Sequence, residues 1–255
     1  MSSNNNFAGD ADMASEQPPI RLAIMQPYLF PYIGYFQLVS AVDIFVVYDD
    51  VNYMKQGWVN RNNVLVDNKA HRFTLPVKAA SSFALIKDVE VDPRAYRPWR
   101  EKFLRTLTQA YSKAPYVKKV TELVSSVLKV DATHIAEISR DSVFAVSAEI
   151  GLSPCFVPSS RTFGNADLKA QVRVLDICRQ VGAGQYVNAI GGTELYRSSA
   201  FKEAGCSLSF LKPGLSHYNQ FKGPFVAGLS IIDVLMFNEP VAIGSLLHDN
   251  ELQYP

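Results

Sequence analysis

The chain has 255 residues, 48% of them hydrophobic, and its 25 Lys and Arg nearly cancel its 24 Asp and Glu. This length and composition allow one large domain or two small ones with a real core. The balanced charge argues against nucleic acid or an anionic membrane as partner. No apolar run approaches the length of a membrane span. The 3 cysteines are widely spaced, which favours free thiols in a reducing compartment and no metal site. We therefore expect a cytoplasmic protein.

The first 18 residues are polar and rich in Ser, Asn and Asp. They lack the basic start and apolar segment of a signal peptide, so they predict a disordered tail. The remaining residues, 19–255, are interpreted as one domain.

A βαβ unit is predicted for residues 21–47. The apolar run 21–25 suits a short buried strand, and two prolines in 26–31 enforce a turn. A helix is expected over 32–42 and a second strand over 44–47, joined by a right-handed crossover.

Polar residues follow both strands of this unit. Gln26 and Tyr28 come after the first strand, and Asp49 and Asp50 come after the second. Ligands of such folds bind beyond the carboxyl ends of the strands. All four residues are therefore candidates for one site.

Two tyrosines, Tyr32 and Tyr35, flank Gly34 where the helix begins. A glycine there admits a ligand close to the backbone, and the helix start attracts anions. The spacing is similar to the His-x-Gly-His turn of adenylyl-transferring enzymes such as pantothenate synthetase. Neutral tyrosines cannot supply the charge of imidazole, which counts against ATP chemistry. The alternative is an aromatic-rich helix packed in the core.

The next loop, residues 51–62, is rich in groups that bind polar ligands. Lys55 and Arg61 are candidates for phosphate binding, Trp58 for stacking on a sugar or base, and Asn60 for hydrogen bonding. The alternative is a surface loop with one buried tryptophan.

Several stretches resemble the WbqC-like protein family. They are IMQPYLFPYIGYFQLV, DIFVVYDDV and KQGWVNRNNVL in the first half, then YNQ at 218–220 and LSIIDVLMFN at 229–238. The resemblance runs from about Arg21 to the C-terminus. It implies a bacterial protein of O-antigen or other surface-polysaccharide biosynthesis. It further implies an acyl or aminoacyl donor and a nucleotide-activated sugar as partners, but no particular cofactor or oligomeric state.

The middle of the chain predicts a hairpin at 65–77, an edge strand at 87–91 and a helical insert at 93–151. Strands are expected again at 185–188 and 207–211, on either side of helical stretches. This alternation predicts an α/β fold, a Rossmann-like and mainly parallel sheet with a helical insert.

The second half adds candidates around the ends of these strands. Ser159-Ser160-Arg161 resembles a second phosphate-binding motif of adenylyl-transferring enzymes, although serine capping is the alternative. His217 is a candidate general base because its pKa lies near working pH. The further substrate-binding candidates are Tyr186, Asn188, Gly191, Tyr218, Gln220 and Asp233.

We interpret the chain as a transferase that moves an acyl or aminoacyl group to a nucleotide-activated amino sugar. Asp49, Asp50 or His217 would deprotonate the acceptor amine. One alternative is an ATP-dependent ligase or nucleotidyltransferase, and another is a non-catalytic sugar-binding or scaffold protein.

Overall fold

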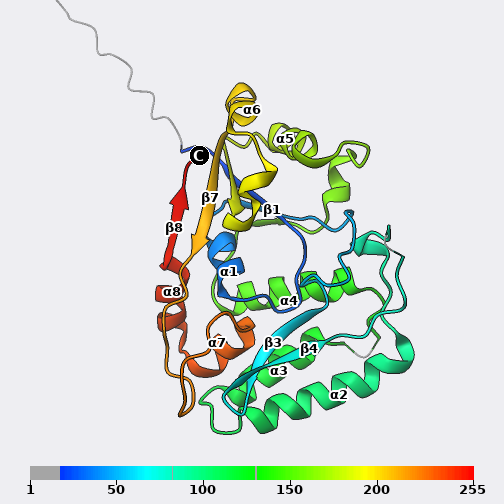
Figure 1. Ribbon diagram of the computed structural model, residues 1–255, viewed down its shortest axis with the longest axis vertical. Helices are drawn as coiled ribbons and strands as arrows, with labels where there is room; N and C mark the ends of the chain where they lie inside the picture. The colour runs from blue at the N-terminus through cyan, green and yellow to red at the C-terminus, as the bar shows by residue number, and fades with distance from the viewer. Residues whose placement is uncertain (1–17, 82, 130) are drawn as a thin grey trace, which may run out of the picture.

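The computed structural model describes residues 18–255 except Ser82 and Val130. The predicted tail, apart from Pro18, lies outside these residues. Six strands form the main sheet in the order β5-β2-β1-β6-β7-β8 (Figure 1). Their bounds are β1 (Arg21–Met25), β2 (Ile44–Val47), β5 (Cys155–Val157), β6 (Gln185–Ala189), β7 (Ser207–Pro213) and β8 (Asn250–Gln253).

Neighbouring strands of this sheet run parallel, except that β8 pairs antiparallel with β7. Numbered along the chain, the strand order is 3-2-1-4-5-6, the order of doubly wound dinucleotide-binding sheets. The predicted mainly parallel α/β fold is confirmed. The order reverses between β1 and β6, so the crevice expected to bind ligands lies at their carboxyl ends.

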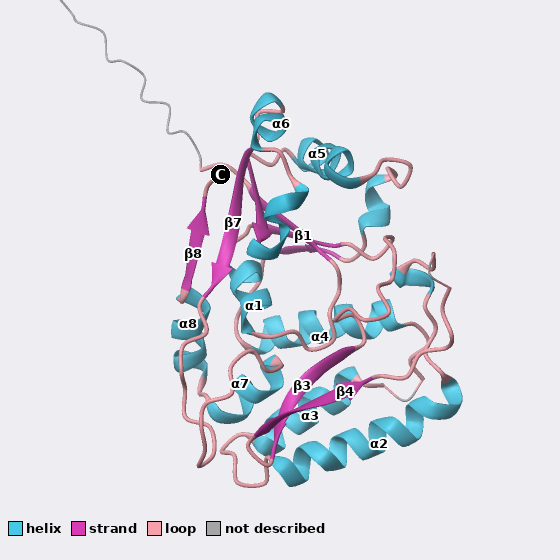
Figure 2. Cartoon of the chain, viewed as in Figure 1, coloured by secondary structure: helices cyan, strands magenta, loops and turns pink. Residues whose placement is uncertain are grey.

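Helices cover both faces of the sheet (Figure 2). Alternate strand residues such as Ala23 and Phe45 share a core with α1 (Ile33–Ser40) and α8 (Pro240–His248). Their neighbours Leu22, Ile24 and Val46 join a second core with α5 (Ala170–Val181) and α6 (Ser198–Glu203). This alternation follows from the two-residue period of a strand.

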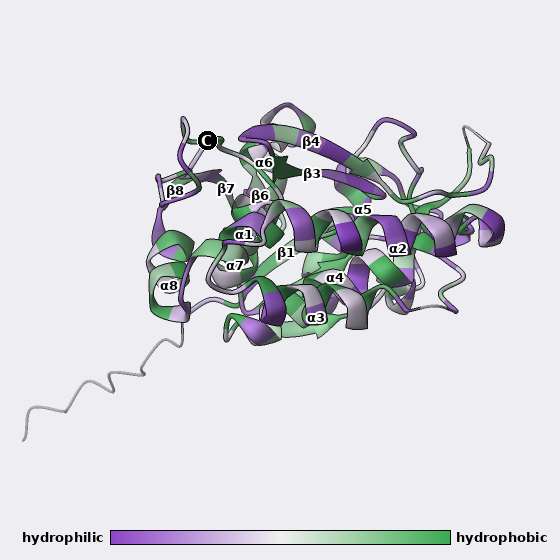
Figure 3. Cartoon of the chain, turned by 90° about the horizontal axis from the view of Figure 1, so that it is seen from below, coloured by the Kyte–Doolittle hydropathy of each residue, from purple (hydrophilic) through white to green (hydrophobic). Residues whose placement is uncertain are grey.

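A hairpin and three helices stand between β2 and β5 in the chain. The hairpin strands are β3 (Arg61–Val66) and β4 (Lys69–Thr74), and the helices are α2 (Pro93–Ala110), α3 (Val117–Val127) and α4 (Ile135–Glu149). Asp67 and Asn68 have φ of 50° and 58°, which suits a two-residue hairpin turn. Figure 3 shows hydrophilic residues along the outer faces of α2 and β4. The hairpin and helices were both predicted.

Some predicted elements differ from the observed ones. Residues 87–91 form no edge strand: they overlap a short 3-10 helix, η1 (Ile86–Asp88), and form two isolated bridges, Glu90 with His134 and Val91 with Val77. The hairpin begins earlier than expected, because Arg61 already pairs with Thr74. Ser230 is the N-cap of helix α7 (Ile231–Phe237), and its hydroxyl accepts from the amide of Ile232. No helix within residues 18–255, apart from the two undescribed positions, has the length and apolar character to cross a membrane.

Candidate functional site at the carboxyl edge of the sheet

The loop after β1 is held in one strained conformation. Phe30 is fully buried with φ of 43°, a region that bulky side chains rarely adopt. Its N–H donates to Ser142 Oγ at 2.9 Å, and its carbonyl accepts from Asn62 Nδ2 at 2.8 Å and Ser230 Oγ at 2.7 Å. These partners belong to α4, to β3 and to the start of α7. Three separate elements therefore fix the loop, as backbone strain requires.

This loop forms one wall of a cavity of about 310 Å³, which we call the aromatic hollow. Trp58 faces it with 44% of its surface exposed. Burial raises the pKa of Tyr28 and of Tyr32, so both hydroxyls are neutral donors at pH 7. The lining residues are Tyr28, Pro31, Tyr32, Trp58, Asn62, Leu215 and Gly228. Flat aromatic faces with phenol hydroxyls suit a sugar or a base.

Gly34 makes room for a tyrosine ring. A Cβ at Gly34 would lie 2.5 Å from Cε2 of Tyr32, whose ring covers the start of α1. A ligand phosphate at this helix start would have to displace that ring. Tyr35 is 3% exposed and donates its hydroxyl to the carbonyl of Gln26 at 2.9 Å, so it supports the loop from the core.

The ends of β1 and β2 leave the sheet side by side, because Met25 pairs with Val47. Beyond them, Asp49 meets the residues that follow β5. Ser159 Oγ donates to Asp49 Oδ1 at 2.7 Å, and Arg161 Nε lies 3.9 Å from Asp49 Oδ2. Asp49 is 5% exposed and has no buried cation of its own among the described residues.

Asp50 is instead neutralised by a buried arginine. Arg173 Nη2 donates to Asp50 Oδ2 at 2.6 Å, and each side chain is 3% exposed. Burial would raise the pKa of Asp50, but the hydrogen bonds from Arg173 and Ser160 and the charge of Arg173 lower it on balance. A paired carboxylate of low pKa is a poor base, so Asp49 is the better placed of the two aspartates.

Sequence reasoning missed Arg173. The signal was present: Arg173 shares the buried stripe of α5 with Val174 and Ile177, where an unpaired charge would be costly. Its guanidinium also lies 5.0 Å from the ring centroid of Tyr48.

Asn188 ends β6 on the other side of the switch point. It is 6% exposed, and no described residue forms a hydrogen bond with its side chain. The side-chain amide of Asn188 lies against Gly192, because a Cβ on Gly192 would collide with it. The neighbouring Gly191 is exposed. Tyr186 is fully buried, with its hydroxyl 3.4 Å from that of Tyr196.

Three other candidates lie in or beside a buried polar network. Asp233 is fully buried and accepts from Tyr111 at 2.7 Å, Tyr218 at 2.5 Å and Gln220 at 2.7 Å. Burial raises the pKa of Asp233, and the three hydrogen bonds offset only part of this effect. The network therefore joins the loop before α7, which carries Tyr218 and Gln220, to Tyr111 of the helical insert. His217, on that loop, is exposed and stacks on Phe225 at 4.3 Å.

Lys55, Asn60 and Arg61 lie apart from Trp58. They line a second cavity, of about 440 Å³, which we call the basic hollow. Its lining residues are Tyr53, Lys55, Asn60, Arg61, Thr74, Leu75, Pro76, Val77, Lys78, Ala79 and Ala80. Trp58 and Arg61, candidates from the same loop, thus line two different hollows.

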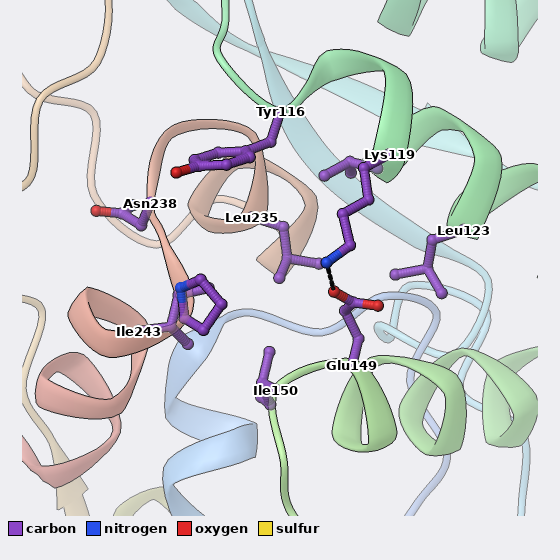
Figure 4. Close-up of a pocket in the computed structure, with 10 residues that line it drawn as sticks. Tyr116, Lys119, Leu123, Glu149, Ile150, Leu235, Asn238 and Ile243 are labelled. Carbon is purple, nitrogen blue, oxygen red and sulfur yellow. Dashed lines mark ion pairs between the residues drawn. The ribbon is translucent and has the colours of Figure 1, made fainter.

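A third cavity lies far along the chain from these residues, between α3, α4 and the segment 235–243 (Figure 4). It measures about 70 Å³ and has the ion pair between Lys119 and Glu149 in its wall, with an N–O distance of 2.5 Å. This volume suits a few waters rather than a sugar. None of the predicted site residues lines it.

Fold and site together define a doubly wound α/β protein with one ligand-sized hollow beside the loop that follows β1 and a second beside the β3–β4 hairpin. Residues 26–244 match the model of the WbqC-like protein family, and the chain belongs to that family. It is similar to the uncharacterized protein Rv1507c of Mycobacterium tuberculosis, with 28% identity over 221 residues, 86% of this chain and 93% of that one. No solved structure matches the chain at a significant level.

Proposed function

We propose that this protein is an enzyme of bacterial surface-polysaccharide biosynthesis, of the O-antigen type. It transfers an acyl or aminoacyl group to a nucleotide-activated amino sugar. Family membership supports the pathway. The observation that carries the reaction is the aromatic hollow, in which Tyr28, Tyr32 and Trp58 surround a space of about 310 Å³. Its wall includes Tyr28 and Pro31 of the loop that follows β1, one of the two strands beside the switch point of the sheet.

In this proposal the sugar stacks on Trp58 and Tyr32, and the amides of Gln26 and Asn188 bind its polar groups. The amine attacks the acyl carbon, so that the N–C bond forms and the bond to the donor's leaving group breaks. Asp49 accepts the proton that the amine loses. Its carboxylate suits this role because its partners are the hydroxyls of Ser159 at 2.7 Å and Ser160 at 3.5 Å and a distant guanidinium, while Asp50 is held by Arg173.

Tryptophan fluorescence tests the sugar site directly. The chain has 2 tryptophans, and Trp99 stacks on Phe103 within the helical insert. A Trp99→Phe variant therefore leaves Trp58 as the sole reporter in the hollow. Titration with nucleotide-activated amino sugars should quench its emission, and Tyr32→Ala should weaken binding at least tenfold. An emission unchanged by every amino sugar tried would refute the sugar site.

Asp49→Asn separates catalysis from binding. A general base contributes typically about 10²–10⁴-fold in rate, so this variant should keep its affinity for the sugar and lose at least about a hundredfold in transfer. Asp88→Asn is the matched control, since Asp88 is exposed and pairs with Lys87. If sugar binds but Asp49→Asn transfers normally, Asp49 is not the base. If sugar binds and the wild type transfers nothing, the non-catalytic sugar-binding alternative is favoured.

An ATP-dependent ligase or nucleotidyltransferase is the second candidate. It is favoured by the strand order and by Ser159-Ser160-Arg161, which follow β5 at the carboxyl edge. The Tyr32 ring over the start of α1 argues against it, because that helix start would bind the phosphates. Pyrophosphate release from ATP in the presence of candidate acids would favour this function over the first.

A further inference from the structure

The basic hollow has no role in the sugar site, yet it carries unbalanced positive charge. Lys55, Arg61 and Lys78 line it. Among the described residues, Lys78 has an acidic partner, Glu90, while Lys55 and Arg61 form no ion pair. Two uncompensated cations around a cavity of about 440 Å³ indicate a ligand with an anionic group.

Two polar atoms of residues that line this hollow are buried and have no hydrogen-bond partner among the described residues, although Nη2 of Arg61 donates to the carbonyl of Lys55. Asn60 is 4% exposed, and its Nδ2 donates to the carbonyl of Leu75 at 2.8 Å, which leaves Oδ1 as the free atom of the amide. Nε of Arg61 is likewise without a partner among the described residues. Buried polar groups normally have partners, so this acceptor and this donor need an explanation.

A ligand that pairs both atoms needs a donor for Asn60 and an acceptor for Arg61. A phosphate, which the sequence suggested for Lys55 and Arg61, is chiefly an acceptor near pH 7 and offers at most one or two P–OH groups to Asn60 Oδ1. An α-amino acid carries an ammonium donor and a carboxylate acceptor on adjacent atoms. It also matches the excess of positive charge, because its carboxylate can pair with Lys55 as well as Arg61.

We propose that the basic hollow binds a free α-amino acid. Its ammonium donates to Asn60 Oδ1, and its carboxylate accepts from Arg61 Nε and Lys55. This inference rests on the proposed function in one respect: the amino acid would be the source of the group that reaches the sugar. Because Trp58 faces the other hollow, the two ligands would lie on either side of the segment 55–60.

Calorimetry with the full chain tests this proposal. The probes are the common L-amino acids and, as partial ligands, acetate, methylamine and inorganic phosphate. We expect at least one amino acid to bind at least tenfold more tightly than any partial ligand. Lys55→Met and Arg61→Gln should each weaken that binding at least tenfold. Lys69→Met is the matched control, since Lys69 is exposed on β4 outside the hollow, and it should bind normally.

Two results would overturn the proposal. Phosphate or acetate that binds as tightly as the best amino acid, with the same loss in Arg61→Gln, would make the hollow a simple anion site. Failure of every probe to bind would remove it as a ligand site. The Trp58→Ala variant separates the amino-acid proposal from the proposed sugar site. This variant should lose sugar binding and keep amino-acid binding unchanged.

Discussion

Ser230 Oγ donates a 2.7 Å hydrogen bond to the carbonyl of Phe30, 200 residues earlier in the chain. The same oxygen accepts from the amide of Ile232 and caps α7, and the N–H of Ser230 donates to the carbonyl of Asn63 at 2.8 Å. One serine thus joins the loop after β1, the hairpin and a C-terminal helix. Ser230 therefore contacts the strained residue, Phe30, of the loop that forms one wall of the aromatic hollow.

Ser230→Ala should therefore lower both stability and affinity. Loss of an N-cap costs about 0.5–2 kcal/mol, and Phe30 loses one of its three hydrogen bonds. We expect the free energy of unfolding in urea to fall by about 1–3 kcal/mol, since a lost net hydrogen bond adds about 1 kcal/mol. Ser126→Ala, an exposed serine bonded to its own helix, is the control. A loss no larger than that of the control would contradict this view of Ser230.

Gly34→Ala should destabilise the protein, although alanine usually stabilises a helix. The new Cβ would lie 2.5 Å from the Tyr32 ring and force it to move. Gly244→Ala in α8 is a matched control, since a Cβ there meets nothing within 4 Å; it should stabilise by about 0.5–1 kcal/mol. The double variant Tyr32→Ala/Gly34→Ala should recover the cost of the clash. If the two substitutions are additive in thermal unfolding, Tyr32 is not what Gly34 accommodates.

Asp50→Asn should be among the most destabilising single changes. Breaking a buried ion pair costs about 3–5 kcal/mol, because the remaining charge is left unpaired. The double variant Asp50→Leu/Arg173→Met should be less harmful than either single change. The pKa of Asp50 is lowered in the folded state, so its contribution is present above the usual aspartate value and is lost as pH falls through the folded pKa. Acid unfolding should show this loss in the wild type and not in Asp50→Asn.

Asp233 should behave in the opposite way with pH. Its folded pKa is raised, so its contribution is fully present below the aspartate value of 3.8 and is lost as pH rises through the folded pKa. The stability difference between wild type and Asp233→Asn should therefore shrink from pH 4 towards neutrality. Urea unfolding of both proteins at several pH values measures this difference in the free energy of unfolding. A constant or growing difference would show that burial does not dominate the protonation of Asp233.

The sequence predicted what depends on local periodicity. The βαβ unit of residues 21–47, the existence of a hairpin after it, and the helices of the insert all follow from short-range pattern. The placement of site residues depends on contacts between distant segments. The partner of Asp50 is Arg173, 123 positions away, and no local pattern joins them. Trp58 and Arg61 are neighbours in the chain, yet they line different hollows, which residue type alone does not reveal.

The strained loop has a consequence for the order in which the protein is made. A positive φ at Phe30 costs on the order of 1–3 kcal/mol, and its three anchors emerge from the ribosome only with residues 62, 142 and 230. The first βα turn is thus made 200 residues before its last anchor, and it reaches its final shape only after Ser230 has emerged. A nascent chain that stops before Ser230 should fail to bind the sugar, which release of stalled chains of increasing length would measure. The chain is thereby kept from engaging its ligand until Ser230 has been made.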